Sequence, residues 1–263
     1  MAPQQGGLTM INAIVLGSGT SMGVPMAGCD CRVCRSGDPR DKRLRPSVLL
    51  EINGFRLLID TSADYRQQML REGISDLDAV LYTHHHVDHI LGLDDLRSFS
   101  MLNKKSYPLF GMRETLQNIR RVFQYVFPED PQAKVYPRVT LREIDENPFE
   151  VGALQVVPIP LLHGQMPVMG YRIGNFAYCT DVSFIPERAF QRLEGLEVLI
   201  LDALRYKPHP THFTVAEAVE AARRIGARQT YFTHISHGIL HREAELPPGM
   251  ALAYDGLTFS VEF

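Results

Sequence analysis

Short apolar runs rich in Val, Ile, Leu and Phe recur along the chain, with turn residues between them. Runs of this length and composition are typical of strands. Asn53-Gly54 joins two of these runs, 47–52 and 55–59, and favours a hairpin with a two-residue turn. We predict further strands at 11–16, 79–82, 154–159, 169–173, 176–179, 198–201, 228–232 and 257–263.

Helical spacing of apolar residues predicts helices at 62–72, 113–125 and 214–225. Ser62 is placed to cap the start of the first helix, and Gly73 is placed to end it. Thr214 precedes the third helix, with Glu217 three residues later, which is the spacing of a capping box.

Strands and helices alternate in both halves of the chain, so we predict one α/β (α+β) domain over residues 11–263, after a disordered tail at 1–10. Residues 99–148 are less regular and contain several prolines, and we expect them to form a lid-like insertion over the functional site. The lid arginines could contact phosphate, although charged helix residues usually face solvent: Arg113, Arg120 and Arg121.

The formal net charge of −3 gives the chain no global attraction to nucleic acid or to an anionic membrane. No apolar run approaches the roughly 18 residues that would cross a bilayer. The first ten residues have neither the basic nor the apolar region of a signal peptide. We therefore expect a cytoplasmic protein without a membrane partner.

Residues 83–89 carry four histidines and one aspartate directly after a predicted buried strand. His84 and His86 alternate, so they fall on one side of an extended turn, while Asp88 and His89 can turn toward a second point. Imidazoles and carboxylates gathered in this way indicate divalent cations. The competing interpretation is a solvated histidine-rich loop or a set of helix caps.

Three of the four cysteines, Cys29, Cys31 and Cys34, lie within six residues. Such a cluster in a chain without an export signal indicates thiolates on a metal rather than disulfides. A closed structural zinc site needs a fourth ligand. Cys179 is available but belongs to a predicted strand, and His237 is the better candidate.

The pattern His84-x-His86-x-Asp88-His89 resembles the HxHxDH signature of the metallo-β-lactamase superfamily. The resemblance implies an αβ/βα sandwich of two mixed β-sheets flanked by helices. It also implies two metal ions that share Asp181 as a bridging ligand. The implied ligands are His84, His86 and His163 for one metal, and Asp88, His89 and His234 for the other.

The CxCxxC segment, together with a histidine three residues after His234, is similar to the PhnP family of cyclic phosphodiesterases. This resemblance implies a structural zinc ion held by Cys29, Cys31, Cys34 and His237. It also implies that His212 is catalytic, with His209 as the second choice. The alternative for His212 is a loop or capping residue before the helix at 214–225.

We predict hydrolysis of a small cyclic or activated phosphodiester, such as phosphoribosyl 1,2-cyclic phosphate. A metal-bridged hydroxide would attack phosphorus, with His212 and Asp88 as catalytic residues. A histidine beside the metals suits protonation of the leaving oxygen. Mn²⁺ and Zn²⁺ both suit mixed imidazole and carboxylate ligands. The resemblance to the PhnP family also implies a homodimer. Asp202 and Ser183 are expected to support the site. Asp60 is a candidate to orient a histidine of the cluster, although solvation or capping explains it equally well.

Two rival functions come from the same superfamily. A tRNase Z-like nuclease would need a Gly/Pro-rich arm and a basic face, and the sequence offers neither. A PqqB-like member would use the same fold, but the complete set of seven ligands favours an active hydrolase. Thioester hydrolysis stays open, since the same metal site serves carbonyl substrates.

Overall fold

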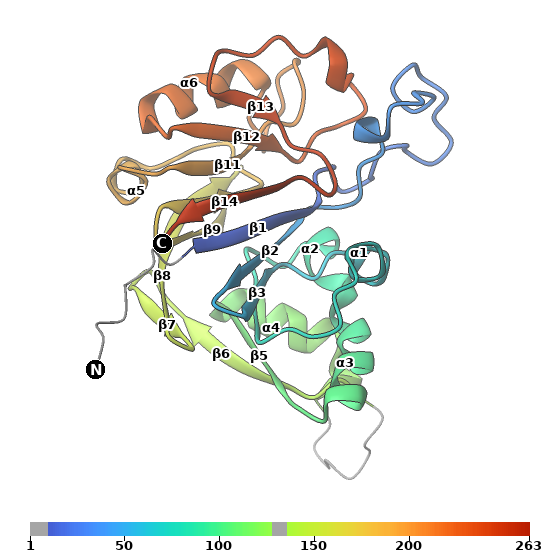
Figure 1. The fold of residues 1–263 in the computed structure, drawn as a ribbon, viewed down its shortest axis with the longest axis vertical. Helices are drawn as coiled ribbons and strands as arrows, with labels where there is room; N and C mark the ends of the chain where they lie inside the picture. Colours follow the sequence, from blue (N-terminus) through green and yellow to red (C-terminus); the bar gives the residue numbers. More distant parts are fainter. Residues whose placement is uncertain (1–9, 128–135) are drawn as a thin grey trace, which may run out of the picture.

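Two seven-stranded sheets face each other in the computed structural model, which describes residues 10–127 and 136–263 (Figure 1). The first sheet has the order β14 (Thr258–Glu262), β1 (Met10–Gly17), β2 (Ser47–Ile52), β3 (Phe55–Ile59), β4 (Ala79–Leu81), β5 (Tyr107–Met112) and β6 (Val139–Ile144). The second has the order β13 (Met250–Leu252), β12 (Gln229–Thr233), β11 (Val198–Asp202), β10 (Phe176–Cys179), β9 (Met166–Ile173), β8 (Leu154–His163) and β7 (Phe149–Val151).

Helices cover the outer face of each sheet. The first sheet is covered by α1 (Tyr65–Glu72), α2 (Val87–Ile90), α3 (Leu96–Asn103) and α4 (Arg113–Val122). The second is covered by α5 (Glu187–Arg192) and α6 (Val215–Ile225). Short 3₁₀ turns occupy Pro39–Asp41, Leu91–Asp95, Gln124–Val126 and His241–Glu243.

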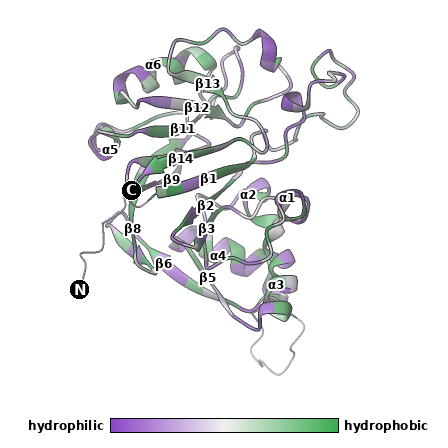
Figure 2. Cartoon of the chain, viewed as in Figure 1, coloured by the Kyte–Doolittle hydropathy of each residue, from purple (hydrophilic) through white to green (hydrophobic). Residues whose placement is uncertain are grey.

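Three layers of buried apolar side chains hold this arrangement. One lies between the sheets, where Val15 and Leu50 of the first sheet belong to the same cluster as Tyr171 and Ile200 of the second. The other two lie under the helices. Helices α4 and α6 show both hydrophilic and hydrophobic residues in Figure 2, as expected for helices with one buried face. The predicted sandwich of two mixed sheets flanked by helices is therefore confirmed.

Locally encoded features match the prediction closely. The hairpin β2–β3 turns at Asn53 and Gly54, both with positive φ. Helix α6 begins after Thr214, whose side chain and that of Glu217 complete the capping box.

The predicted start of the first helix is wrong by three residues. Helix α1 begins at Tyr65, because the Ser62 hydroxyl donates to the Gln68 side chain and accepts from the Asp64 N–H instead of capping a helix. Other boundaries also differ, among them those of α4 and β8. Helix α4 ends at Val122, and β8 continues through two prolines to His163. Among the described residues, no strand pairs with the β7-facing edge of β8 beyond residue 156, and prolines are tolerated at such an edge.

The region 99–148, expected as a lid-like insertion, supplies two strands of the first sheet. Strand β5 pairs in parallel with β4, and β6 pairs in parallel with β5. Residues 128–135 of that region, and residues 1–9 of the expected tail, lie outside the described residues. Within the described residues, no helix combines the length and the apolarity that crossing a membrane requires.

Candidate metal centre and adjoining cavity

The predicted metal ligands come together from loops at the carboxyl ends of four strands. His84 follows β4, His163 ends β8, Asp181 follows β10 and His234 follows β12. A parallel bridge between Gly19 and Ile235 and a hydrogen bond from the Met169 N–H to the Thr83 carbonyl tie the two sheets together at this edge.

The ligand atoms form two groups, and in each group all atoms lie within 4.8 Å of one another. The first group is His84, His86, His163 and Asp181, and the second is Asp88, His89, Asp181 and His234. Asp181 is the shared member. Its Oδ1 lies 3.9 Å from Nε2 of His84, and its Oδ2 lies 3.1 Å from Nε2 of His89. The arrangement thus has the two half-sites that the sequence pattern suggested.

Outer partners fix the orientation of three histidine rings. Nδ1 of His89 lies 2.7 Å from Oδ2 of the fully buried Asp60, and Nδ1 of His163 donates to the carbonyl of Thr211 at 2.6 Å. Nδ1 of His84 lies 3.0 Å from the Thr83 hydroxyl. Each ring therefore presents Nε2 to the centre, which is the arrangement that metal-binding histidines usually have.

The inward-facing nitrogens provide a test of whether these residues fit a cation. Nε2 of His84, His89 and His234 is buried, and among the described residues none of the three has a hydrogen-bond partner. Burial of a polar atom without a partner is costly. Divalent metal ions would satisfy all three, so the donor set fits them.

Charge in the centre points the same way. Burial opposes protonation of His234, but the carboxylates, Asp181 foremost, outweigh burial and raise its pKa to about 9. For His84 and His163, burial dominates and lowers the pKa, which keeps these two imidazoles neutral. Burial opposes ionisation of Asp88, but His89 and His234 outweigh it and lower its pKa. The ionised carboxylates thus favour positive charge at this centre, on the His234 ring or on a bound cation, while His84 and His163 stay neutral.

Backbone strain is also concentrated here. Asp60, Asp181 and His234 have φ values of 65°, 56° and 60°, in the left-handed region that non-glycine residues rarely adopt. Such conformations persist where the surrounding structure enforces them, and they cluster at functional sites.

His212 lies against both ligand groups. Its ring stacks on that of His234 at 4.6 Å between centroids, and it meets the ring of His163 edge-on at 4.5 Å. Oδ2 of Asp202, which also accepts from the Phe213 N–H, lies 3.2 Å from its Nδ1. Because Thr214 caps α6, His212 is not the cap of that helix, and it lies in the loop before it.

The cysteine cluster closes around His237 at the end of the N-terminal loop. Nδ1 of His237 lies 3.3, 3.6 and 3.7 Å from the sulfurs of Cys29, Cys31 and Cys34. A tetrahedral zinc site with ordinary bond lengths places sulfur and nitrogen roughly 3.5 Å apart. The Cys34 backbone N–H is the largest influence on the pKa of Cys31, which is lowered to about 6 and so favours the thiolate. The fourth cysteine, Cys179, is buried in the core under α5 and α6.

A buried ion pair that sequence analysis did not identify holds the His237 segment in place. Arg43 and Asp41 are both fully buried, 2.9 Å apart. Arg43 also donates to the carbonyls of Ser236 and Ile239, on either side of His237. A charged pair separated by one residue gives no periodic signal, so only the fold identifies it.

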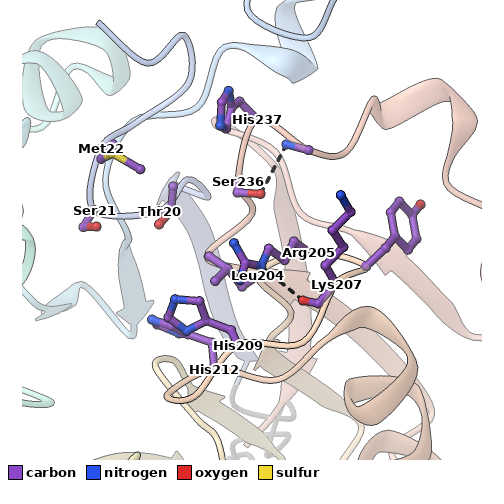
Figure 3. Close-up of a pocket in the computed structure, with 12 residues that line it drawn as sticks. Thr20, Ser21, Met22, Leu204, Arg205, Lys207, His209, His212, Ser236 and His237 are labelled. Carbon is purple, nitrogen blue, oxygen red and sulfur yellow. Dashed lines mark hydrogen bonds between the residues drawn. The ribbon is translucent and has the colours of Figure 1, made fainter. Parts of the chain in front are cut away.

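A cavity of about 430 Å³ opens beside His212. Figure 3 shows three groups of side chains around it: His209 and His212; Arg205 and Lys207; and Thr20, Ser21 and Met22. Ser236 and His237 close the remaining side. The segment 204–207 was not predicted to be functional, because a short loop of mixed residues carries no motif. The lid arginine Arg113 pairs instead with Glu143.

A family model described as the beta-lactamase superfamily domain matches residues 55–235, which include every residue of the two ligand groups. The chain belongs to the beta-lactamase superfamily. A solved structure of a diphosphatase from the PhnP family is similar over 97% of this chain and 99% of its own, with 46% identity and a TM-score of 0.92. This superfamily member is therefore PhnP-like.

Two further relatives extend the comparison. An octanoyltransferase of Porphyromonas gingivalis is 42% identical over 256 residues, which is 94% of this chain and 51% of that protein. The chain thus spans about half the length of that relative. The Zn²⁺-bound PqqB of Methylobacterium extorquens shares the superfamily fold, with a TM-score of 0.75 and 23% identity over 94% of this chain and 99% of its own.

Proposed function

We propose that this superfamily hydrolase cleaves a small cyclic or otherwise activated phosphodiester, using two divalent metal ions, Mn²⁺ or Zn²⁺. The observation that carries the proposal is the pair of ligand groups that share the buried Asp181, with His212 packed against both. Cys29, Cys31, Cys34 and His237 would hold a third ion, a structural zinc.

Two ions bound at these groups would supply a water of lowered pKa and neutralise the charge that develops on phosphate oxygens. His84, His86 and His163 would hold one ion, and Asp88, His89 and His234 the other, with Asp181 between them. Asp60 keeps the His89 ring in the orientation that binding needs.

His212 would act on the leaving oxygen of the substrate. Asp202 accepts from its Nδ1–H, which leaves Nε2 to carry the transferable proton. The stacking on His234 holds the ring beside the centre. A histidine in this position can protonate the leaving oxygen as the bond to phosphorus breaks. General acid catalysis of this kind raises the rate about 10²–10⁴-fold.

The PhnP-family relative supports phosphorus rather than carbon as the atom attacked. That relative is a diphosphatase, and its similarity covers nearly the whole of both chains. Hydrolysis of a diphosphate is therefore the second candidate function. The octanoyltransferase is about twice as long as this chain, which matches only about half of it. The name of that relative is therefore no ground for assigning acyl transfer to this chain.

Hydrolysis assays with added Mn²⁺ or Zn²⁺ test the proposal. We expect turnover of bis(p-nitrophenyl) phosphate or of 2′,3′-cyclic nucleotides, and its loss in Asp181→Ala. An ester of diphosphate assayed in parallel decides between the two candidates. Protein shown to hold both active-site metals, yet inactive on all three phosphate substrates, would contradict the proposal, and thioester substrates would then be tested.

A further inference from the structure

The first ligand group draws its histidines from both sheets. His84 and His86 come from one loop after β4, whereas His163 comes from the tip of the β8–β9 hairpin in the other sheet. His163 pairs with Met166, so the turn between them consists of two residues, 164 and 165. Because loop tips move more than the strands they join, the position of His163 relative to the other two ligands depends on what holds this turn.

The side chain of Ser183 bonds the chain on both sides of His163. Its hydroxyl accepts from the Gly164 N–H at 2.8 Å and donates to the Leu162 carbonyl at 3.0 Å. The same carbonyl also accepts from the backbone N–H groups of Ser183 and Phe184. One hydroxyl thus fixes the two peptide groups that flank a metal-ligand candidate.

Thr211 holds a different part of the same ligand. Its carbonyl accepts from Nδ1 of His163, which sets the direction of the ring, whereas Ser183 holds the backbone. The turn is also packed closely against Thr211. Gly164 has a φ of 64°, and a Cβ atom there would lie 2.9 Å from Cγ2 of Thr211. Neither contact replaces the other, because ring direction and backbone position are separate degrees of freedom.

The segment that carries Ser183 is itself anchored within the site. Asp181, which both ligand groups share, stands two residues before Ser183. The Val182 carbonyl between them accepts from the Phe213 N–H at 2.7 Å, next to His212. The two bonds of Ser183 therefore attach the hairpin tip to a segment that is fixed to the loop of the proposed acid.

We infer that Ser183 is a positioning residue that sets the affinity of the first ligand group for its metal ion. It acts through His163, whose Nε2 it keeps beside Oδ1 of Asp181, 4.0 Å away, and it belongs to neither ligand group itself. The inference rests on the proposed pair of metal ions, but it is independent of which substrate is cleaved.

Titration with Co²⁺ tests the inference, in protein freed of active-site metal by mild chelation. We expect two binding steps in the wild type, each followed by the visible absorption of Co²⁺. His86→Ala identifies the step of the first group and Asp88→Ala that of the second, because each variant removes a ligand of one group alone. Ser183→Ala should weaken the first step about tenfold or more and change the second by less than about twofold.

Two further variants separate positioning from a general loss of stability. Ser183→Thr keeps the hydroxyl and should bind both ions as the wild type does. Ser98→Ala is the matched control, because the Ser98 hydroxyl also donates to a backbone carbonyl, that of Asp95, outside both ligand groups. An unchanged first step in Ser183→Ala, or an equal weakening of both steps, would overturn the inference.

The titration needs no turnover, so its outcome and that of the proposed reaction can be told apart. A wild type that binds both ions but cleaves none of the phosphate substrates would contradict the proposed function, and the Ser183 variants would still decide the inference. Equal Co²⁺ binding by Ser183→Ala and an active wild type would refute the role of Ser183 and leave the proposed function intact.

Discussion

Nδ1 of His212 lies 3.2 Å from Oδ2 of Asp202, and this contact links the candidate acid to the strand β11. The same carboxylate accepts from the backbone N–H groups of Phe213 and Val182, so it is held from three directions. Its Oδ1 also lies 3.8 Å from Nδ1 of His234. Asp202 therefore positions the proposed acid, and it lies beside the metal-ligand candidate His234 without a hydrogen bond to it.

Removing the His212 imidazole should abolish turnover without removing metal. We expect His212→Ala to lower kcat by about 10²–10⁴, with metal content unchanged, because the ring belongs to neither dinuclear ligand group. Asp202→Asn should also lower kcat. If Asp202 acts through His212, the double variant should lose no more than His212→Ala alone. Losses that multiply in the double variant would show that the two residues act independently.

Asp60→Asn should weaken metal binding at the second group. The carboxylate of Asp60 is fully buried, and among the described residues its hydrogen-bond partners are His89 and Thr83. Loss of such an outer partner typically costs about 10–100-fold in metal affinity. Competition with a chelating dye measures the change. Asp145→Asn, at an exposed position, is the control, and equal affinities in the two variants would contradict the positioning role of Asp60.

The elements that sequence predicted best are those that neighbouring residues encode. The β2–β3 hairpin follows from the φ preferences of Asn53 and Gly54, and α6 follows from its capping box. The helix at 62–72 was placed too early because the Ser62 hydroxyl has a tertiary partner, Gln68, that no local pattern reveals. The expected lid at 99–148 is wrong for β5 and β6, because short segments in a proline-containing stretch look irregular in sequence until they pair in the sheet.

The candidate site also combines features that neighbouring residues encode with features that only the fold creates. The cluster at 83–89 can be recognised in the sequence because its ligands are adjacent. His163 and His234 needed the family resemblance, since they lie far along the sequence from this cluster, at the ends of β8 and β12 in the other sheet. The Arg43–Asp41 pair had no signal at all, because its role depends on a buried loop contact that only the assembled fold creates.

The cysteine cluster should hold one zinc ion that mild chelation does not remove. We expect about three metal ions per chain after full loading, one of them resistant to chelation. Cys31→Ser should lose that ion and lower the unfolding midpoint by about 5–10 °C. Cys179→Ala is the control, because Cys179 is buried away from the cluster. Equal zinc content in Cys31→Ser and wild-type protein would refute the assignment.

Asp255 should make the stability of the fold depend on pH. Burial is the largest influence on this carboxyl and raises its pKa from 3.8 to about 6, although Ser18 and Leu44 donate hydrogen bonds to it. The folded chain therefore binds the proton more tightly than the unfolded chain. The stability this group contributes is complete below pH 3.8 and is lost as the pH rises through about 6. The total change in the free energy of unfolding is about 3 kcal/mol.

Urea unfolding from pH 4 to 8 should show this fall in stability in the wild type. Asp255→Asn should have a flatter profile, since its amide does not titrate, and the same slope in both proteins would exclude Asp255 as the source.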